Sequence, residues 1–168
     1  MSQRLNRYRL ADFSSGYSPR EKVRLALWRV LSRTAFEPWF VPVSARVALL
    51  RAFGATVSDG VVVRSGVRIH APWFLKIGAH SWLGEEVRIV NHAQVVIGAD
   101  VCLSQQVFVC SSGHDPYDAN FSYAHRPVRI EDNVWLTLRA TVLPGTTVAR
   151  GSTIYPGAVL RPELPRHA

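Results

Sequence analysis

Branched apolar residues recur every six positions through most of the chain, in groups of three that begin at Val57. An α-helix repeats every 3.6 residues and a single strand every two, so neither element alone accounts for a period of six. The fourth residue of many hexads is Gly, Asp or Asn, which tolerate tight corners, and the fifth is usually small or β-branched. The pattern predicts a mainly β chain in which short strands joined by turns stack as a β-solenoid of five three-sided coils. The repeat positions are Val57, Val63, Ile69; Ile77, Leu83, Ile89; Ile97, Leu103, Val109; Ile130, Leu136, Val142; and Val148, Ile154, Leu160.

The repeat is interrupted twice briefly and once at length. Between the first three groups the spacing grows from six to eight, which predicts insertions at positions 75–76 and again at 95–96. Between Val109 and Ile130 about fifteen residues leave the scaffold as a loop, which we place at 111–129. This loop is rich in Pro, Tyr, Phe and Asn rather than in the residues typical of disordered segments. A long loop on a rigid scaffold usually carries function, so it is the first place to look for a site.

The N-terminal third follows a different pattern. Residues 1–18 show no period and are expected to be an extended arm. Ser18, followed three residues later by Glu21, predicts a helix start, and the helical pattern runs to about Thr34. A second short helix is expected over residues 43–53. The apolar residues of the first helix are expected to share one face, and they are Val23, Leu27, Val30 and Leu31.

The chain of 168 residues carries a net charge of +8, much of it between Arg4 and Arg33. Such charge fits nucleic acid, an anionic membrane surface, a phosphorylated ligand or simply a solvated basic face. Its concentration near the N-terminus favours a membrane or another anionic partner over a nucleic-acid groove. No apolar run is long enough to span a bilayer, and no signal peptide is seen. Cys102 and Cys110 make no disulfide framework, so we expect packing roles for both thiols in a cytoplasmic protein.

Several local motifs, taken with the hexad repeat, resemble a known family. The segments NVWL at 133–136, LPGTTV at 143–148 and GHD at 113–115 resemble the maltose, nodulation and galactoside O-acetyltransferases, a branch of the hexapeptide-repeat acyltransferases. The segments ALLRAFGA at 48–55, APWFLKIG at 71–78 and CSSGHD at 110–115 are similar to the colanic-acid-type acetyltransferases of exopolysaccharide gene clusters. The resemblance implies a left-handed parallel β-helix domain over 57–168, preceded by an arm and capping helices over 1–56. The left hand comes from the resemblance alone, because crossover physics favours the right hand.

Acetyl transfer from a thioester to a sugar hydroxyl requires a base, and imidazole suits that task near neutral pH. His114, at the mouth of the loop, matches the catalytic histidine of the family, which implies the role of general base. Asp115 is expected either to orient that ring or to point elsewhere. Asn91 and His92, one coil earlier, and Tyr117 in the loop are candidate acceptor-binding residues. The alternative for Asn91 and His92 is a polar pair at a corner of the coil.

Further histidines introduce a metal alternative. His70, His80, His92 and His125 could indicate the zinc carbonic anhydrases, which share the hexapeptide fold. A zinc site would require three imidazoles to converge on one ion. No second histidine follows His114 closely, so we expect no metal.

The resemblance also implies that acetyl-CoA lies in a groove between neighbouring β-helices, against the last coils. Arg161 or Arg150 would meet the nucleotide phosphates. The chain departs from many relatives at Thr137, where they have Gly, and at Pro156, which offers no N–H. The candidate CoA-binding residues are Trp135, Thr137, Tyr155, Gly157, Ala158 and Arg161.

The resemblance therefore implies an acetyl-CoA-dependent O-acetyltransferase that acts on a sugar of an exopolysaccharide or surface glycan, and we expect it to be a homotrimer. The alternatives are a non-catalytic β-helix scaffold for polysaccharide assembly and an acyltransferase with a different acyl group or an amino acceptor. The first helix is expected to cap the open coil at 57–69, with contact between its basic face and an anionic membrane as a second role. No nucleic acid is expected as a partner.

Overall fold

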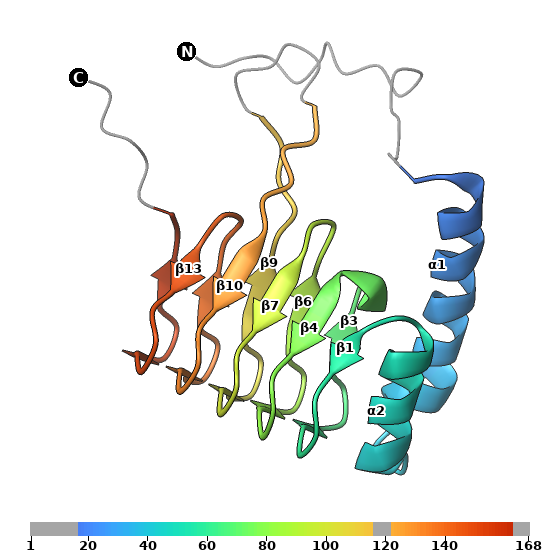
Figure 1. Ribbon diagram of the computed structural model, residues 1–168, viewed down its shortest axis with the longest axis horizontal. Coiled ribbons are helices and arrows are strands. Elements are labelled where there is room, and N and C mark those ends of the chain that lie inside the picture. The colour runs from blue at the N-terminus through green and yellow to red at the C-terminus, as the bar shows by residue number, and fades with distance from the viewer. Residues whose placement is uncertain (1–16, 116–121, 163–168) are drawn as a thin grey trace.

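The computed structural model describes residues 17–115 and 122–162 and forms a triangular solenoid of five coils with two helices at one end (Figure 1). Each side of the triangle is a five-stranded parallel sheet. The first side contains β1 (Thr56–Val57), β4 (Leu75–Ile77), β7 (Val95–Ile97), β10 (Val128–Ile130) and β13 (Thr147–Val148). The second side contains β2 (Val62–Val63), β5 (Trp82–Leu83), β8 (Cys102–Leu103), β11 (Trp135–Leu136) and β14 (Thr153–Ile154). The third side contains β3 (Arg68–Ile69), β6 (Arg88–Val90), β9 (Phe108–Cys110), β12 (Thr141–Val142) and β15 (Val159–Leu160).

The apolar repeat positions form the core of the solenoid. Val57 pairs with Ile77, Ile77 with Ile97, and Ile97 with Ile130, so equivalent residues of successive coils stack directly. Thirteen of the fifteen repeat positions are buried, and the two that are partly buried lie in the last coil. Small or β-branched residues at the fifth position also point inward. The predicted fold class, a parallel β-solenoid built from hexads, is confirmed.

The regular corners place the fourth hexad residue in the left-handed region of backbone space. Gly60 and Gly145 have φ of 71° and 83°, as the turn-forming residues predict. Ordinary residues adopt the same conformation where the sequence supplies no glycine, for example Glu86 and Arg139 at 60° and 58°. The coil geometry therefore imposes this conformation even on residues for which it is strained.

One corner, between the third and first sides, is irregular in the first three coils. We call it the irregular corner; among the described residues it consists of 70–74, 91–94, 111–115 and 122–127. It contains the 3₁₀ helix η4 (Pro72–Phe74). The extra residues predicted at 75–76 and 95–96 lie instead in the turns just before them. Positions 75–76 belong to β4, which pairs in register with β7, and positions 95–96 belong to β7, which pairs in register with β10.

The N-terminal segment consists of α1 (Pro19–Leu31), the π-helix η3 (Ser32–Phe36) and α2 (Val43–Ala52). The start of α1 is as predicted: the Ser18 side chain accepts from the Glu21 amide, and the Glu21 carboxylate accepts from the Ser18 amide at 2.8 Å. The predicted apolar face of α1 was wrong. Its buried residues are Leu25 and Trp28. Three of the four residues expected on the buried face instead point outward, with Val23, Leu27 and Val30 exposed by 62%, 56% and 64%, while Leu31 is half-buried.

The helices cover the open end of the first coil (Figure 1). Trp28, Phe36 and Leu50 are almost fully buried and belong to the same apolar core as the first coil. The Trp28 indole N–H donates to the Ile69 carbonyl at 2.7 Å, and Arg46 donates to the carbonyls of Phe36 and Pro38 at 2.8 and 2.6 Å. The Trp28 bond satisfies a backbone carbonyl of the first coil, and the Arg46 bonds satisfy carbonyls of the helical segment itself. Within residues 17–115 and 122–162, none of the helices has the length and apolar character needed to cross a bilayer.

Candidate active site

The loop at the irregular corner leaves the solenoid on a short two-stranded stem. The Asp115 amide donates to the Ser122 carbonyl at 2.9 Å, and the Ala124 amide donates to the Gly113 carbonyl at 2.8 Å. Between these bonds His114 and Tyr123 form an antiparallel bridge. The stem therefore fixes the backbone on both sides of His114, even though the loop itself is long.

Aromatic and histidine rings of three coils gather around this stem. The Tyr123 ring lies 4.7 Å from the rings of both His114 and His125, measured between centroids. His92 lies 4.9 Å from His125 and stacks on His70 at 4.2 Å. We call these five residues the ring cluster. Four histidines separated by up to 55 positions thus meet at one corner, because the coil period stacks equivalent turns.

Burial and neighbouring positive charge lower the pKa values of the inner imidazoles of the ring cluster. The Tyr17 hydroxyl lies 3.3 Å from His70 Nε2 and 3.2 Å from His92 Nδ1. Burial, followed by the charges of His92 and Arg29, lowers the pKa of His70 to about 4. Burial also lowers the pKa of His92 and of His125. Near neutral pH these rings therefore supply an uncharged wall beside His114.

The side chains of Asn91 and Ser111 form hydrogen bonds between successive coils at the irregular corner. The Asn91 side chain is fully buried; its Oδ1 accepts from the Ala71 amide at 3.0 Å and its Nδ2 donates to the Ala71 carbonyl at 2.7 Å. One coil later, Ser111 Oγ accepts from the Ala93 amide at 3.0 Å and donates to the Ala93 carbonyl at 2.8 Å. Both polar ends of the Asn91 amide are thus engaged within the chain. This geometry favours the corner role for Asn91 over direct contact with an acceptor.

The remaining acceptor-side candidates divide between the surface and the undescribed part of the loop. Asp115 is exposed at the top of the stem. His92 is partly exposed and belongs to the ring cluster, so it remains close to His114. Tyr117 lies outside the described residues. The sequence did not predict a role for Tyr17 or Tyr123, and His70 and His125 were discounted. The signal for the histidines is that His70, His92 and His125 each come after the third apolar repeat position of a coil.

The candidate CoA-binding residues lie elsewhere on the same protomer. Trp135 is on the second side, and its indole N–H donates to Ser104 Oγ at 2.9 Å. Thr137 is nearly buried and donates its hydroxyl to the Ile154 carbonyl at 2.5 Å. Tyr155, Gly157 and Ala158 follow β14 at the next corner, where Tyr155 is 80% exposed. Arg161 lines a cavity of about 460 Å³ beside β13 and β15.

The second side and the irregular corner are opposite one another in the triangular cross-section. The irregular corner joins the third side to the first, so the second side is the one side that it does not touch. Trp135 and His114 of one protomer therefore face away from each other.

Metal chemistry finds no support in the described part of the chain. There, no group of three His, Cys, Asp or Glu side chains has a geometry that could hold an ion. The histidines of the ring cluster contact one another through ring faces, whereas zinc requires nitrogen lone pairs aimed at one point. Cys102 and Cys110 are free thiols.

Comparison with known proteins identifies the family of this chain. No family model matches the chain. A protein of Escherichia coli K12 that carries the name colanic acid biosynthesis acetyltransferase WcaF is 31% identical over 160 residues, which cover 93% of this chain and 87% of that protein. This chain belongs to the hexapeptide-repeat acetyltransferase family. It is therefore an acyltransferase.

Other relatives and solved structures agree with this family. The galactoside O-acetyltransferase of E. coli K12 is 25% identical over 126 residues, covering 73% of this chain and 62% of that protein. A hexapeptide-repeat acetyltransferase of Vibrio cholerae, solved with acetyl coenzyme A, superposes with a TM-score of 0.78 at 17% identity, covering 94% of this chain and 86% of that one. A galactoside acetyltransferase solved with coenzyme A gives 0.75 at 21% identity, with coverages of 86% and 74%. These two superpositions establish the fold.

Proposed function

We propose that this protein transfers the acetyl group of acetyl-CoA to a hydroxyl of a sugar in exopolysaccharide or surface-glycan biosynthesis, with His114 as the general base. The observation that carries the proposal is the position of His114. It lies on a rigid stem at the only irregular corner of the described coils of an acetyltransferase-family solenoid. The name of the E. coli relative supports the glycan context.

The chemistry requires one side chain that both accepts and returns a proton. In the proposed reaction the His114 imidazole removes the proton of the sugar hydroxyl as the oxygen attacks the thioester carbonyl. The tetrahedral intermediate then collapses, the carbon–sulfur bond breaks, and the leaving CoA sulfur takes the proton from the imidazolium. The neutral rings beside His114 favour this role, because a permanent positive charge there would oppose formation of the imidazolium.

We also propose that the active form is a homotrimer with acetyl-CoA between protomers. Since Trp135 and His114 face opposite ways in one protomer, a cofactor that touches both must be shared by two copies. Trp82 and Trp135 on the second side are 43% and 49% exposed and stack in register above and below Cys102, which leaves an apolar row for a partner copy.

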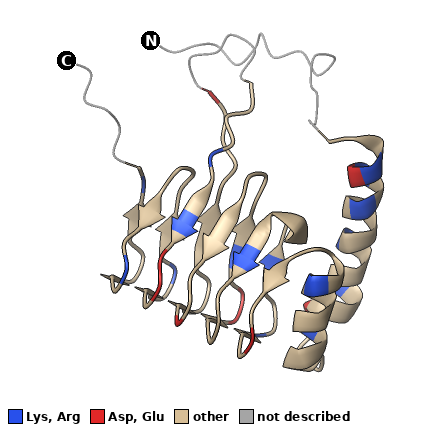
Figure 2. Ribbon diagram, viewed as in Figure 1, with Lys and Arg blue, Asp and Glu red and all other residues tan. Residues whose placement is uncertain are grey.

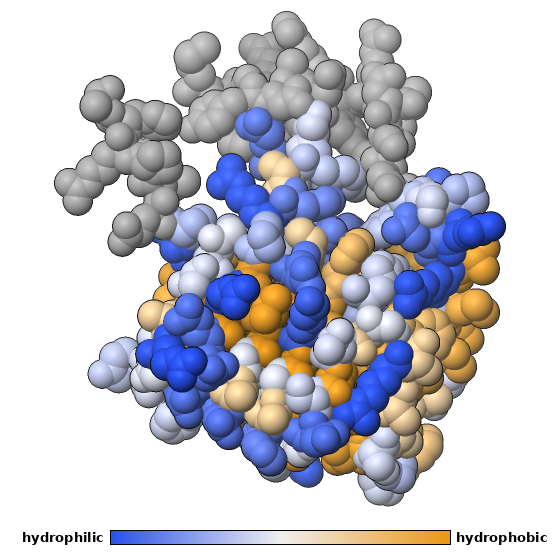
Figure 3. All heavy atoms as spheres, in the orientation of Figure 1, coloured by the Kyte–Doolittle hydropathy of each residue, from blue (hydrophilic) through white to orange (hydrophobic). Residues whose placement is uncertain are grey.

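A peripheral position at a membrane, on the cytoplasmic side, completes the proposal. Val23, Leu27 and Val30 are exposed, and their helical spacing puts them in one stripe on the outer face of α1. Figure 3 shows apolar surface at its right, where the helices lie. Helical spacing places the exposed cations Arg20 and Lys22 on either side of this stripe. Figure 2 shows basic residues along the whole of α1. An apolar stripe with flanking cations fits the surface of an anionic bilayer.

The test of the reaction is release of CoA thiol from acetyl-CoA in the presence of a panel of sugar acceptors. His114→Ala should lower the rate by about 10²–10⁴-fold because general-base catalysis is lost. The matched control is His80→Asn, which should retain wild-type activity. His80 lies at an exposed corner with φ of 57°, a backbone conformation that asparagine tolerates. If the purified, folded His114→Ala protein kept more than about half of the activity, another group would be the base. Light scattering on the same samples should give the mass of a trimer, and a fully active monomer would contradict the shared site.

A further inference from the structure

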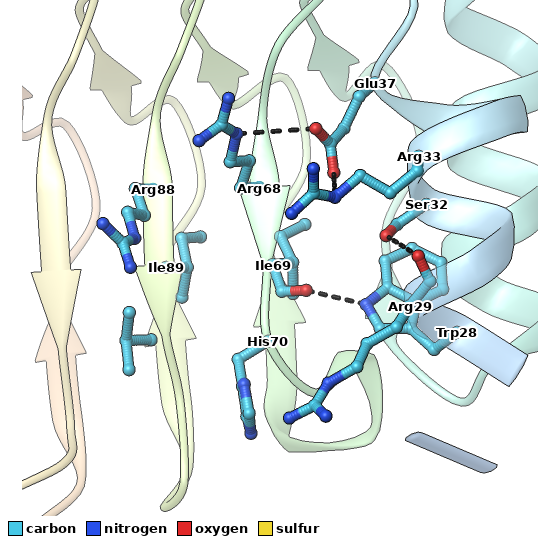
Figure 4. Close-up of a pocket in the computed structure, with 11 residues that line it drawn as sticks. Trp28, Arg29, Ser32, Arg33, Glu37, Arg68, Ile69, His70, Arg88 and Ile89 are labelled. Carbon is cyan, nitrogen blue, oxygen red and sulfur yellow. Dashed lines mark hydrogen bonds and ion pairs between the residues drawn. The ribbon is translucent and has the colours of Figure 1, made fainter. Parts of the chain in front are cut away.

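A basic cavity lies between α1 and the third side of the solenoid, away from the CoA candidates. Its volume is about 310 Å³, at the lower end of the range for small-molecule sites. Four arginines surround it from two directions (Figure 4). Arg29 and Arg33 come from α1 and η3, while Arg68 and Arg88 come from β3 and β6. We call it the arginine cavity.

The arginine cavity carries a large excess of positive charge. Its one carboxylate, Glu37, lies 3.4 Å from Arg68 Nε and 3.9 Å from Arg33 Nε. Arg29 and Arg88 make no ion pair with any carboxylate of the described residues. Four guanidinium groups around one carboxylate repel one another, and an anion between them would relieve that repulsion.

Ring contacts link one wall of the arginine cavity to the proposed catalytic base. His70 lines the cavity and stacks on His92 at 4.2 Å. His92 lies 6.4 Å from Tyr123, whose ring is 4.7 Å from His114. Three successive ring contacts thus lead from the cavity to His114. Because the pKa of His70 is lowered to about 4, its uncharged ring is a neutral wall along this path near pH 7.

We propose that the arginine cavity binds the diphosphate of a sugar diphosphate acceptor, with the sugar extending along the ring cluster to His114. This inference rests on the proposed function. Guanidinium groups recognise phosphate oxygens through paired hydrogen bonds. The excess of three positive charges matches a diphosphate better than a single carboxylate. A neutral glycoside would leave Arg29 and Arg88 without a counter-charge.

The candidate CoA-binding residues lie on other coils than this cavity. The arginine cavity belongs to the first two coils, whereas the candidate donor residues belong to the last two. His114, which follows the third coil, lies between these ends. The donor and the acceptor would therefore approach the base from opposite ends of the solenoid.

The first experiment is calorimetric titration of the intact protein with inorganic pyrophosphate. The double variant Arg29→Gln/Arg88→Gln removes the two cavity arginines that have no ion pair. Its matched control, Lys76→Gln/Arg129→Gln, removes the same charge from exposed positions outside the cavity. The cavity variant should bind pyrophosphate about tenfold or more weakly than wild type, and the control should stay within about twofold to threefold. Equal affinities in the two variants, or no binding by wild type, would overturn the proposal.

The second experiment identifies the source of the diphosphate and separates this inference from the proposed reaction. UDP-glucose and a polyprenyl diphosphate glucose in lipid vesicles are each tested for competition with pyrophosphate. The compound that displaces pyrophosphate identifies the source of the diphosphate. If neither displaces it, the proposed site is refuted. In the acetyl-transfer assay the cavity variant should raise the acceptor KM with the acetyl-CoA KM unchanged. Transfer to simple glycosides that pyrophosphate does not inhibit would refute the inference and leave the reaction standing. Tight, cavity-dependent binding without any transfer would leave the site standing and refute the reaction.

Discussion

Replacing Asn91 by alanine separates the two roles that the sequence allowed for this residue. In the structure Asn91 is fully buried, and its amide makes two hydrogen bonds to Ala71, at 3.0 and 2.7 Å. The substitution leaves the Ala71 N–H buried without a partner, whereas the Ala71 C=O keeps its bond from the Phe74 amide at 3.0 Å. An unsatisfied buried N–H costs about 1–3 kcal/mol, and the lost second bond to the C=O adds a smaller cost. We therefore expect a loss of about 2–3 kcal/mol in the free energy of unfolding.

Thermal unfolding of wild type and variant at equal protein concentration measures this loss. For a chain of this size the expected shift is on the order of 10 °C in Tm. Gln94→Ala, at an exposed position of the same corner, is the control and should leave Tm unchanged. If instead Asn91 contacts the acceptor, Asn91→Ala would raise the acceptor KM at an unchanged Tm. That outcome would refute the structural role argued from the buried amide.

Two further predictions concern the ring cluster and the outer face of α1. The pKa of His70 is lowered to about 4 in the folded protein. As the pH falls below about 6.5, the unfolded chain therefore binds a proton at this residue that the folded protein does not bind. The free energy of unfolding should fall between pH 6.5 and 4. In urea titrations at several pH values, His70→Gln should remove about 1 kcal/mol of this loss, a figure reduced because the ring is partly exposed. Equal pH dependence of stability in variant and wild type would contradict the lowered pKa of His70. Wild type should sediment with anionic vesicles at low salt and much less with neutral vesicles or at high salt. Serine at Val23, Leu27 and Val30 together should abolish this binding, and binding that survives the change would exclude the stripe as the contact.

Most of the fold could be predicted because the solenoid is locally encoded. Each hexad places one branched residue inward, and its stacking partner is the equivalent residue of the next coil, so the period alone gives strand order and register. The capping box at Ser18 is equally local, since both partners lie within one helical turn. The turn residues of the hexads gave the corners for the same reason.

The candidate site could be predicted only in part. His114 was found from the interruption of the repeat and from the family resemblance. The gathering of His70, His92 and His125 around Tyr123 was not, because no local pattern states which turns share a corner once their lengths differ. The insertions were likewise assigned a few residues too late, since the strand register that places them depends on the pairing of β4 with β7 and of β7 with β10.

The sequence by itself determined the coil period, the strands and the place where the scaffold opens, because these follow from contacts between residues at fixed short spacing. Only the tertiary structure decided which side of α1 is buried, since Trp28 is held by Ile69, 41 residues away. It also decided that Asn91 belongs to the interior and that four arginines from α1, η3, β3 and β6 surround one cavity. These features depend on how a helix and a solenoid end meet, and that meeting is set by the packing of residues far apart in the chain.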